Sequence, residues 1–214
     1  MKIKICGITN LADARYAAAA GADYLGFVQY RKSPRFLEPS SAKEIIDWVF
    51  GSSSVGIFVN ETPEEVNRIS DLASFELVQL HGSETVAICK AINRPVIKAF
   101  RIRPGTTVDD MRRQMTPFAE AVEYFLLDAF DEAEPGGTGK RVDWNLAHTL
   151  ASEFPLFLAG GLNPKNAVQA AQTVQPFALD VSSGLESEPG RKDFGKIDAF
   201  FVSLDEHSLL GEEV

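Results

Sequence analysis

The sequence is poor in cysteine, in histidine and in long hydrophobic runs. Its two cysteines, Cys6 and Cys89, are too few for a disulfide framework, which is typical of a reduced, cytoplasmic protein. Its three histidines lie far apart without metal-ligand spacing, which argues against a histidine-rich metal site. Because the N-terminus carries no long apolar stretch, we expect neither a secretory signal nor a membrane span.

Basic residues are also scarce. The 214 residues include 21 Lys and Arg against 30 Asp and Glu, so the formal net charge is -9 at pH 7. Such an acidic chain is not expected to bind nucleic acid or an anionic membrane. We therefore expect a small-molecule ligand. The sequence leaves the oligomeric state open between a monomer and a homodimer. If the ligand is an anion, local Lys, Arg and backbone N–H groups must attract it.

Apolar residues make up 45% of the chain and gather into eight short runs that alternate with helical segments. This alternation predicts parallel strands, and the chain is near the lower size limit of one βα barrel. The expected fold is α/β, a single-domain (β/α)8 TIM barrel over residues 1–203, with an acidic tail, 204–214, that frays. The expected strands are residues 2–6, 23–28, 55–59, 75–81, 95–100, 123–128, 155–160 and 177–181.

Polar residues mark the expected helix starts. Side chains that can cap a helix precede most of the helical segments, and Ser41 with Glu44 fits a capping box. The predicted starts are Asn10, Ser41, Thr62, Ser83, Thr107, Asp143 and Asn163. The last helix is expected over about 193–202.

Small residues follow the last two expected strands. Gly160 and Gly161 end the seventh, and Ser183 and Gly184 follow the eighth. A βα barrel often binds phosphate at these two loops through exposed N–H groups, so we predict a phosphate site there, helped by a short helix after Gly184. The alternative is two tight turns that need small residues. The other possible fold, a doubly wound open sheet, normally has its glycine-rich turn after the first strand.

Two residues at strand ends can carry acid–base chemistry. Cys6 ends the first strand and Asp128 the sixth, and all strand-to-helix loops of a barrel meet at one mouth. A thiol and a carboxyl that face a sugar phosphate can act as base and acid, so we predict that both are catalytic. The alternatives are a small buried hydrophobic residue for Cys6 and a capping carboxylate for Asp128.

Further polar residues are expected at the same mouth as substrate-binding groups. Gln79 and His81 share one face of the fourth strand, although a lone His is often structural. Arg35 lies in the long second loop, where its fork is suited to a carboxylate, although a solvated surface Arg is the default. Gly137 belongs to a GGTG run in the sixth loop that either closes over ligand or is a flexible linker.

Asp180 and Lys4 are predicted to pair inside the barrel. Asp180 shares a strand face with Ser182, and Lys4 shares a face with Cys6. The eighth strand neighbours the first in a closed barrel, and a buried Lys is costly unless paired. The pair would hold an ammonium near the thiol and raise its thiolate share. The alternative is a structural Lys4 with no effect on Cys6.

The motifs of the chain fall in the order of a known family. They are KICGIT, GADYLGFV, KSPR, VGIFVN, VQLHG, VIKAF, LLDAF, GGTG, DW, LAGGLNPKN, DVSSGLES and PGRKD. Each is weak alone, but the ordered set is specific and extends to about Phe201. Together they closely resemble the phosphoribosylanthranilate isomerase family of tryptophan biosynthesis.

The resemblance implies an Amadori rearrangement without a cofactor. The substrate would be N-(5-phosphoribosyl)anthranilate and the product the 1-deoxyribulose 5-phosphate aminoketose. It implies that Cys6 is the general base, that Asp128 is the general acid and that Arg35 holds the anthranilate carboxylate. It also implies that the phosphate is bound by Gly160, Gly161, Ser183 and Gly184. The chain departs from the family pattern in the second loop, where Gln29 and Arg31 stand in place of an expected apolar residue and an expected proline.

Three other functions compete with this one. An aminoaldose isomerase of the histidine pathway would use two aspartates, but here the first strand ends in Cys6. A pentose-phosphate epimerase would need metal-binding His and Asp residues at strand ends, and His81 alone is placed for that. A barrel that binds a sugar phosphate without turnover would not need both Cys6 and Asp128.

Overall fold

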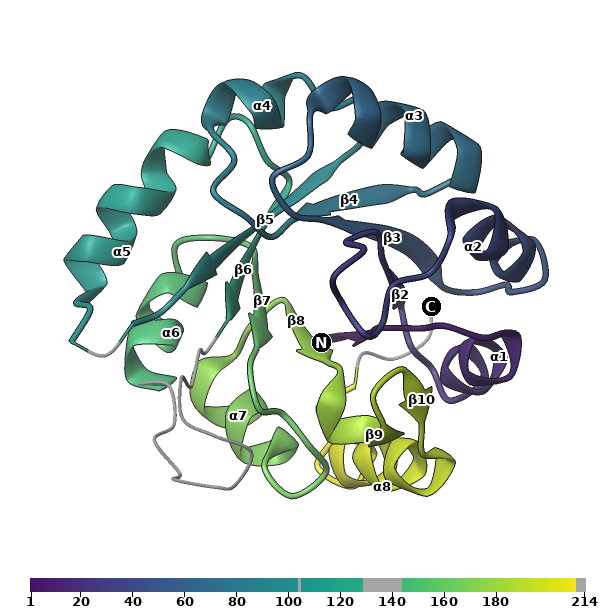
Figure 1. Cartoon of the computed structure of the whole chain (residues 1–214). Helices are drawn as coiled ribbons and strands as arrows, with labels where there is room; N and C mark the ends of the chain where they lie inside the picture. Colours follow the sequence, from purple (N-terminus) through teal and green to yellow (C-terminus); the bar gives the residue numbers. More distant parts are fainter. Residues whose placement is uncertain (104, 129–143, 211–214) are drawn as a thin grey trace.

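Eight parallel strands close into a barrel in this computed structural model, and helices surround it (Figure 1). The structure describes residues 1–103, 105–128 and 144–210. The barrel strands are β1 (Lys2–Cys6), β2 (Tyr24–Val28), β3 (Ser53–Phe58), β4 (Leu77–Leu80), β5 (Val96–Arg101), β6 (Tyr124–Asp128), β7 (Leu156–Ala159) and β8 (Ala178–Val181). An antiparallel hairpin, β9 (Glu186–Glu188) with β10 (Arg191–Lys192), follows β8.

The described helices lie outside the barrel. They are α1 (Leu11–Ala19), α2 (Pro39–Ile46), α3 (Pro63–Ala73), α4 (Val86–Lys90), α5 (Val108–Met115), α6 (Trp144–Ala151), α7 (Ala167–Val174) and α8 (Phe194–Asp205). Two one-turn 3-10 helices, η1 (Thr116–Phe118) and η2 (Ser183–Leu185), complete the set. Within the described residues, no helix has the length and apolar character needed to cross a bilayer.

Pairing between the first and last strands closes the barrel. β1 pairs in parallel with β2, where Cys6 lies opposite Gly26, and with β8, where Lys4 lies opposite Asp180. The predicted single-domain barrel is therefore confirmed, and the open sheet is wrong because neither β1 nor β8 is a free edge. All eight predicted strands are present, with small shifts at their ends.

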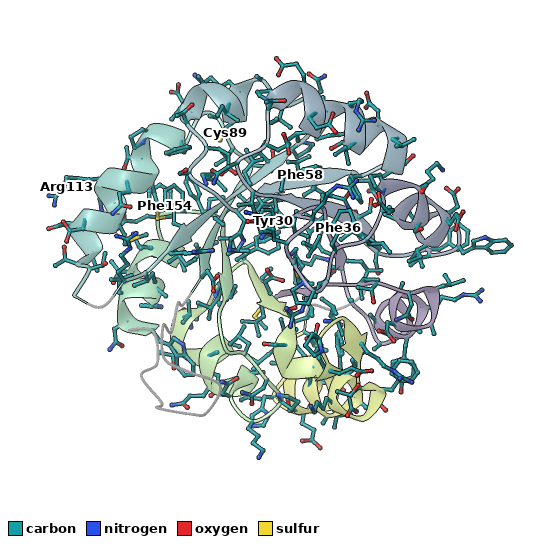
Figure 2. The ribbon with its side chains drawn as sticks, viewed as in Figure 1. Tyr30, Phe36, Phe58, Cys89, Arg113 and Phe154 are labelled. Carbon is teal, nitrogen blue, oxygen red and sulfur yellow. The ribbon has the colours of Figure 1, made fainter. Side chains whose placement is uncertain are left out.

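Apolar residues form two layers of core. Residues on the outer strand faces pack against the helices, and Cys89 of α4 lies in this layer (Figure 2). Residues on the inner faces fill the barrel itself, among them Val55, Leu126 and Phe157. Because strand side chains alternate between faces, a residue two positions from an inner one, such as Gln79 after Leu77, lines the same interior.

Three of the predicted helix starts are confirmed as caps. Asn10 accepts a hydrogen bond from the N–H of Asp13, and Thr62 accepts one from Glu65. Thr107 forms a complete capping box with Asp110. In each case the side-chain oxygen binds an N–H group that the first turn leaves without an intrahelical partner.

Three other predicted starts are wrong, each because the side chain has a different role. Ser41 lies inside α2, since Pro39 already occupies the first turn. Ser83 donates to Asn60, and Thr85 caps α4 instead. The side chain of Asn163 accepts from the N–H of Lys165 in a local turn, and α7 begins only at Ala167. Asp143 lies outside the described residues.

The last helix is longer than expected. α8 begins after Asp193, whose side chain accepts from the N–H of Lys196, and it runs to Asp205. Leu204 is fully buried, because it continues the apolar face that covers the barrel. The boundary at residue 203 and the fraying of the tail remain predictions.

Gly56 on β3 provides a test of the outer core. A Cβ built on Gly56 would lie 2.4 Å from Cδ2 of Phe75 and 2.9 Å from Cε2 of Phe58. We expect Gly56→Ala to lower the free energy of unfolding by about 1–3 kcal/mol, because both rings must move. The control is Gly195→Ala in α8, where a Cβ meets only Oδ1 of Asp193, at 3.4 Å. Urea unfolding should show the first variant destabilised and the second not. Equal stability of Gly56→Ala and the parent would contradict the packing described.

Candidate active site

The C-terminal ends of the strands bring the two predicted catalytic residues to one mouth. Cys6 ends β1 and Asp128 ends β6, and both side chains are partly exposed. The thiol has space because its neighbour on β2 is a glycine. A Cβ on Gly26 would lie 3.1 Å from Sγ of Cys6 and 3.1 Å from its Cα.

The predicted pair of Lys4 and Asp180 is confirmed. Nζ of Lys4 donates to Oδ2 of Asp180 at 2.9 Å, and both side chains are buried. The pairing follows from the register of β1 and β8, which places the two residues opposite each other. Oδ1 of Asp180 is also buried and accepts no hydrogen bond from the described residues.

The electrostatic environment of Cys6 contains opposing charges. Burial and the charge of Asp180 raise the pKa of the Cys6 thiol, whereas Lys4 and Lys192 lower it, and the pKa ends above its ordinary value. At neutral pH the thiol is therefore mostly protonated in the ligand-free protein. The two lysines oppose the increase in this pKa that burial causes.

Lys192 is a functional candidate that sequence reasoning missed. Its ammonium is buried and donates to the carbonyl oxygens of Cys6, at 2.6 Å, and Ser182, at 3.3 Å. It also donates to Oε1 of Glu186 at 3.0 Å. The only sequence signal was the PGRKD motif, which indicates the family but not this contact. Lys192 thus joins the end of β1 to the loop after β8.

Arg35 lies over the mouth in a two-point ion pair with Glu186. Its Nε donates to Oε1 of Glu186 at 2.8 Å and its Nη2 donates to Oε2 at 2.5 Å. Burial raises the pKa of Glu186, but the hydrogen bond from Arg35 and the charge of Lys192 outweigh it, so this pKa lies below its ordinary value. Glu186 is therefore ionised at neutral pH. Sequence reasoning missed this residue too.

The loop after β2 contains Gln29 and Arg31, the two residues at which the sequence departs from the family pattern. Contacts made by these two side chains hold the loop in place. Nε2 of Gln29 donates to the carbonyl of Leu37 at 3.2 Å. Arg31 pairs with Glu38 at 3.0 Å, and its guanidinium lies 4.9 Å from the ring centroid of Phe36. These contacts close the loop that carries Arg35.

His81 connects Asp128 to the barrel interior. Nε2 of Gln79 lies 2.8 Å from Nδ1 of His81, and Nε2 of His81 lies 3.3 Å from Oδ2 of Asp128. Because the amide of Gln79 can only donate through its nitrogen, a neutral His81 accepts at Nδ1 and carries its proton on Nε2. His81 then donates to Asp128 and orients its carboxyl group. Oε1 of Gln79 is buried and has no partner among the described residues.

The four residues predicted to bind phosphate come together in the turns after β7 and β8. Gly160 and Gly161 have φ values of 91° and 64°, which favour glycine. A Cβ on Gly184 would lie 1.9 Å from the carbonyl oxygen of Leu162, so the two turns touch. In the part of the chain that the structure describes, the N–H groups of Gly161, Ser183 and Gly184 donate to no protein oxygen. The expected helix after Gly184 is wrong: the helical turn is η2, and β9 follows it, because Glu186 pairs with β10.

A cavity of about 670 Å³ opens beside His81, at the ends of β3, β4 and β5. This volume is in the range of sites for small molecules. Its lining includes Arg101, which lies opposite Asp128 in the register of β5 and β6 and which sequence reasoning missed. Gly137 lies outside the described residues.

The comparisons with known proteins agree with this geometry. The family model for N-(5'-phosphoribosyl)anthranilate isomerase matches residues 3–203. The isomerase of Citrifermentans bemidjiense is 46% identical over 98% of this chain and 99% of that protein. The isomerase of Trichlorobacter lovleyi is 45% identical over 96% of this chain and 98% of its own.

Solved structures show the same likeness. The crystal structure of phosphoribosyl anthranilate isomerase from Thermotoga maritima has a TM-score of 0.86 and 40% identity, over 96% of this chain and 99% of that one. Another crystal structure of such an isomerase contains reduced 1-(o-carboxyphenylamino)-1-deoxyribulose 5-phosphate. It has a TM-score of 0.83 and 38% identity, over 96% of this chain and 99% of that one.

A closed barrel with a thiol, a carboxylate and an imidazole at its mouth defines a single-domain TIM-barrel enzyme. Among such enzymes it is an isomerase, because the match covers nearly the whole chain. The chain belongs to the N-(5'-phosphoribosyl)anthranilate isomerase family.

The opposing charges around Cys6 lead to a prediction about its titration. We expect Lys4→Met to raise the pKa of the Cys6 thiol, because it removes a cation and leaves the negative Asp180 uncompensated. The measurement is the rate of alkylation by iodoacetamide against pH, in a Cys89→Ala background so that one thiol reacts. Lys2→Met is the matched control, since Lys2 lies on the same strand but pairs with Asp23 at 2.7 Å.

The outcome is decided by the order of the three titration curves. The Cys6 thiol should titrate at higher pH in Lys4→Met than in the parent. The curve for Lys2→Met should coincide with that of the parent. If Lys4→Met fails to fold, the double variant with Asp180→Asn removes both buried charges and should still titrate above the parent, since Lys4 acts on the thiol more strongly than Asp180 does. Curves for Lys4→Met and the parent that superimpose would show that Lys4 is only structural.

Proposed function

We propose that the protein converts N-(5-phosphoribosyl)anthranilate into 1-(2-carboxyphenylamino)-1-deoxyribulose 5-phosphate, a step of tryptophan biosynthesis. The observation that supports this most is the placement of Cys6 and Asp128 on separate strands of one mouth, in a chain whose whole length matches the isomerase family. Substrate and product are isomers, so the reaction moves protons and requires no cofactor.

Asp128 acts first, as the general acid. It gives its proton to the ring oxygen of the ribose, the bond from that oxygen to C1' breaks, and a Schiff base forms between C1' and the anthranilate nitrogen. Oδ2 of Asp128 accepts from His81, which leaves Oδ1 to carry the proton. His81 and Gln79 orient this carboxyl group.

Cys6 acts second, as the general base. Its thiolate takes the proton from C2', and the electron pair of that bond forms the C1'–C2' double bond of an enolamine while the iminium nitrogen becomes neutral. The enolamine then takes a proton at C1' while its C2' hydroxyl group loses one, so that C2' becomes the carbonyl carbon of the aminoketose. Lys4 and Lys192 support this step, because each lowers the pKa of the thiol from the value that burial alone would set.

The remaining predicted residues position the substrate. Arg35 binds the anthranilate carboxylate. Asp180 and Gln79 each have one buried oxygen that no described residue binds, and these oxygens accept hydrogen bonds from sugar hydroxyl groups. The phosphate is bound by N–H groups of the turns that contain Gly160, Gly161, Ser183 and Gly184. The proposed role of Gly137, which lies outside the described residues, rests on the GGTG motif alone.

The proposed base also indicates the cellular compartment in which the reaction takes place. A free thiol that must ionise needs a reducing compartment, so we place the enzyme in the cytoplasm. Its partner is the small sugar phosphate and not a nucleic acid, in keeping with the net charge of -9.

The proposed acid and base lead to one kinetic prediction. We expect Cys6→Ala and Asp128→Asn each to lower kcat by about 10²–10⁴-fold, because each removes a proton-transfer group. The assay follows the change in fluorescence as phosphoribosylanthranilate is consumed, with and without a chelator, and a product analogue reports binding. Cys89→Ala is the control, since that thiol lies in the outer core. Half of the parent activity in Cys6→Ala would exclude the thiol as base.

The phosphate turns can be tested without turnover. We expect crystals soaked in the reduced product analogue to show its phosphate on the N–H groups of Gly161, Ser183 and Gly184, because no described residue accepts from those donors. Phosphate density at the loop after β2 or β4 would contradict the assignment.

A further inference from the structure

Arg35 has hydrogen-bonding capacity that Glu186 does not use. A guanidinium carries five N–H groups, one on Nε and two on each terminal nitrogen. Glu186 occupies the Nε–H and one N–H of Nη2. The edge formed by Nη1 and Nη2 therefore keeps three N–H groups, and no described residue accepts from them. This edge has the fork geometry that binds a second carboxylate at two points.

Glu186 is held in place by the hairpin and its neighbours. Its carbonyl oxygen accepts from Nζ of Lys196 at 2.6 Å, and its carboxylate accepts from Lys192. The N–H of Lys192 donates to buried Asp13 of α1 at 2.8 Å. Figure 1 shows the hairpin against α8, beside the end of β8. Glu186 is thus hydrogen-bonded to α8 and to β10, and β10 is in turn hydrogen-bonded to α1.

The stem of Arg35 is confined from the other side. Gly7 follows Cys6 with φ of 80°, and a Cβ built there would lie 2.6 Å from Cδ of Arg35 and 3.1 Å from Oγ of Ser182. The absence of that Cβ lets the Arg35 side chain lie close to the backbone next to the thiol. The backbone at Gly7 therefore confines Cδ of Arg35, and Glu186 holds its guanidinium.

We propose that Glu186 is a positioning residue that holds the Arg35 fork with its unused edge presented to the carboxylate of the substrate. The proposal rests on the proposed function of Arg35 as the carboxylate-binding group. A long Arg side chain loses rotamer freedom when it binds a ligand, and a fork already fixed by a buried partner avoids that loss. Glu186 therefore raises the affinity for a ligand that carries the carboxylate and leaves the affinity for one that lacks it unchanged.

A competing role for Glu186 would change the affinity for the carboxylated ligand in the opposite direction. If Glu186 competed with the substrate for Arg35, removal of its charge would release the fork and tighten the binding of the carboxylated ligand. The two roles are separated by the carboxylate preference, which is the ratio of dissociation constants for two ligands. These are reduced 1-(2-carboxyphenylamino)-1-deoxyribulose 5-phosphate and its phenylamino counterpart without the carboxyl group.

The experiment measures this preference by calorimetry in four proteins. The parent should prefer the carboxylated ligand, and Arg35→Met should lose that preference. Glu186→Gln should reduce it by about tenfold, the typical effect of a lost charged hydrogen bond, while it binds the phenylamino ligand as the parent does. Glu188→Gln is the matched control from the same strand. The side chain of Glu188 is exposed and, among the described residues, pairs with Arg191 alone, at 3.5 Å. Glu188→Gln should therefore keep the parent preference.

Each outcome decides one of the two claims. An unchanged or increased preference in Glu186→Gln overturns the positioning role, whereas equal preferences in the parent and Arg35→Met overturn the proposed function of Arg35. If Glu186→Gln does not fold, Glu186→Asp keeps the charge beside Lys192 but withdraws the carboxylate by one methylene. It should lower the preference in the same direction, and an unchanged preference would overturn the proposal.

Discussion

The pairing of β1 with β8 is the constraint on which the site depends. It closes the barrel, places Lys4 opposite Asp180 and sets the loop after β8 beside the end of β1. Lys192 then reaches the carbonyl oxygens of both ends, and Glu186 reaches Arg35. If this register shifted by one residue, Lys4 and Asp180 would face opposite sides of the sheet, and the thiol would lose its cationic neighbours.

The charges at this junction are buried as pairs in a protein of net charge -9. A buried ion pair is weak evidence for stability, but breaking one leaves an uncompensated charge, which is costly. The pKa shift of Glu186 implies a pH dependence of stability. Its pKa in the folded state lies below its ordinary value, so its contribution to stability is present at neutral pH and is lost as the pH falls through the folded pKa. Acid should therefore loosen the hairpin and Arg35 together.

Sequence reasoning succeeded where the signal is local or follows from closure. Eight apolar runs predicted the strands, and the alternation of faces in β1 and β8 predicted the contact between Lys4 and Asp180. It failed where one polar side chain had several possible partners. Asn163 binds its own turn instead of starting α7. Lys192 and Glu186 were missed because their partners Cys6 and Arg35 are more than a hundred residues away in sequence, and only the folded hairpin brings them together.

The central claim is that the thiol of Cys6, set between Lys4, Asp180 and Lys192, is the base of the reaction. The most direct test compares two pH profiles of the parent protein: the alkylation rate of Cys6 and kcat/KM, which reports ionisations of the free enzyme. The account predicts that kcat/KM rises with pH along the alkylation curve of the thiol. It also predicts that both curves move together when Lys4 is replaced by Met. A rise in kcat/KM centred at a different pH from the thiol titration, or one that stays in place when the titration moves, would contradict it.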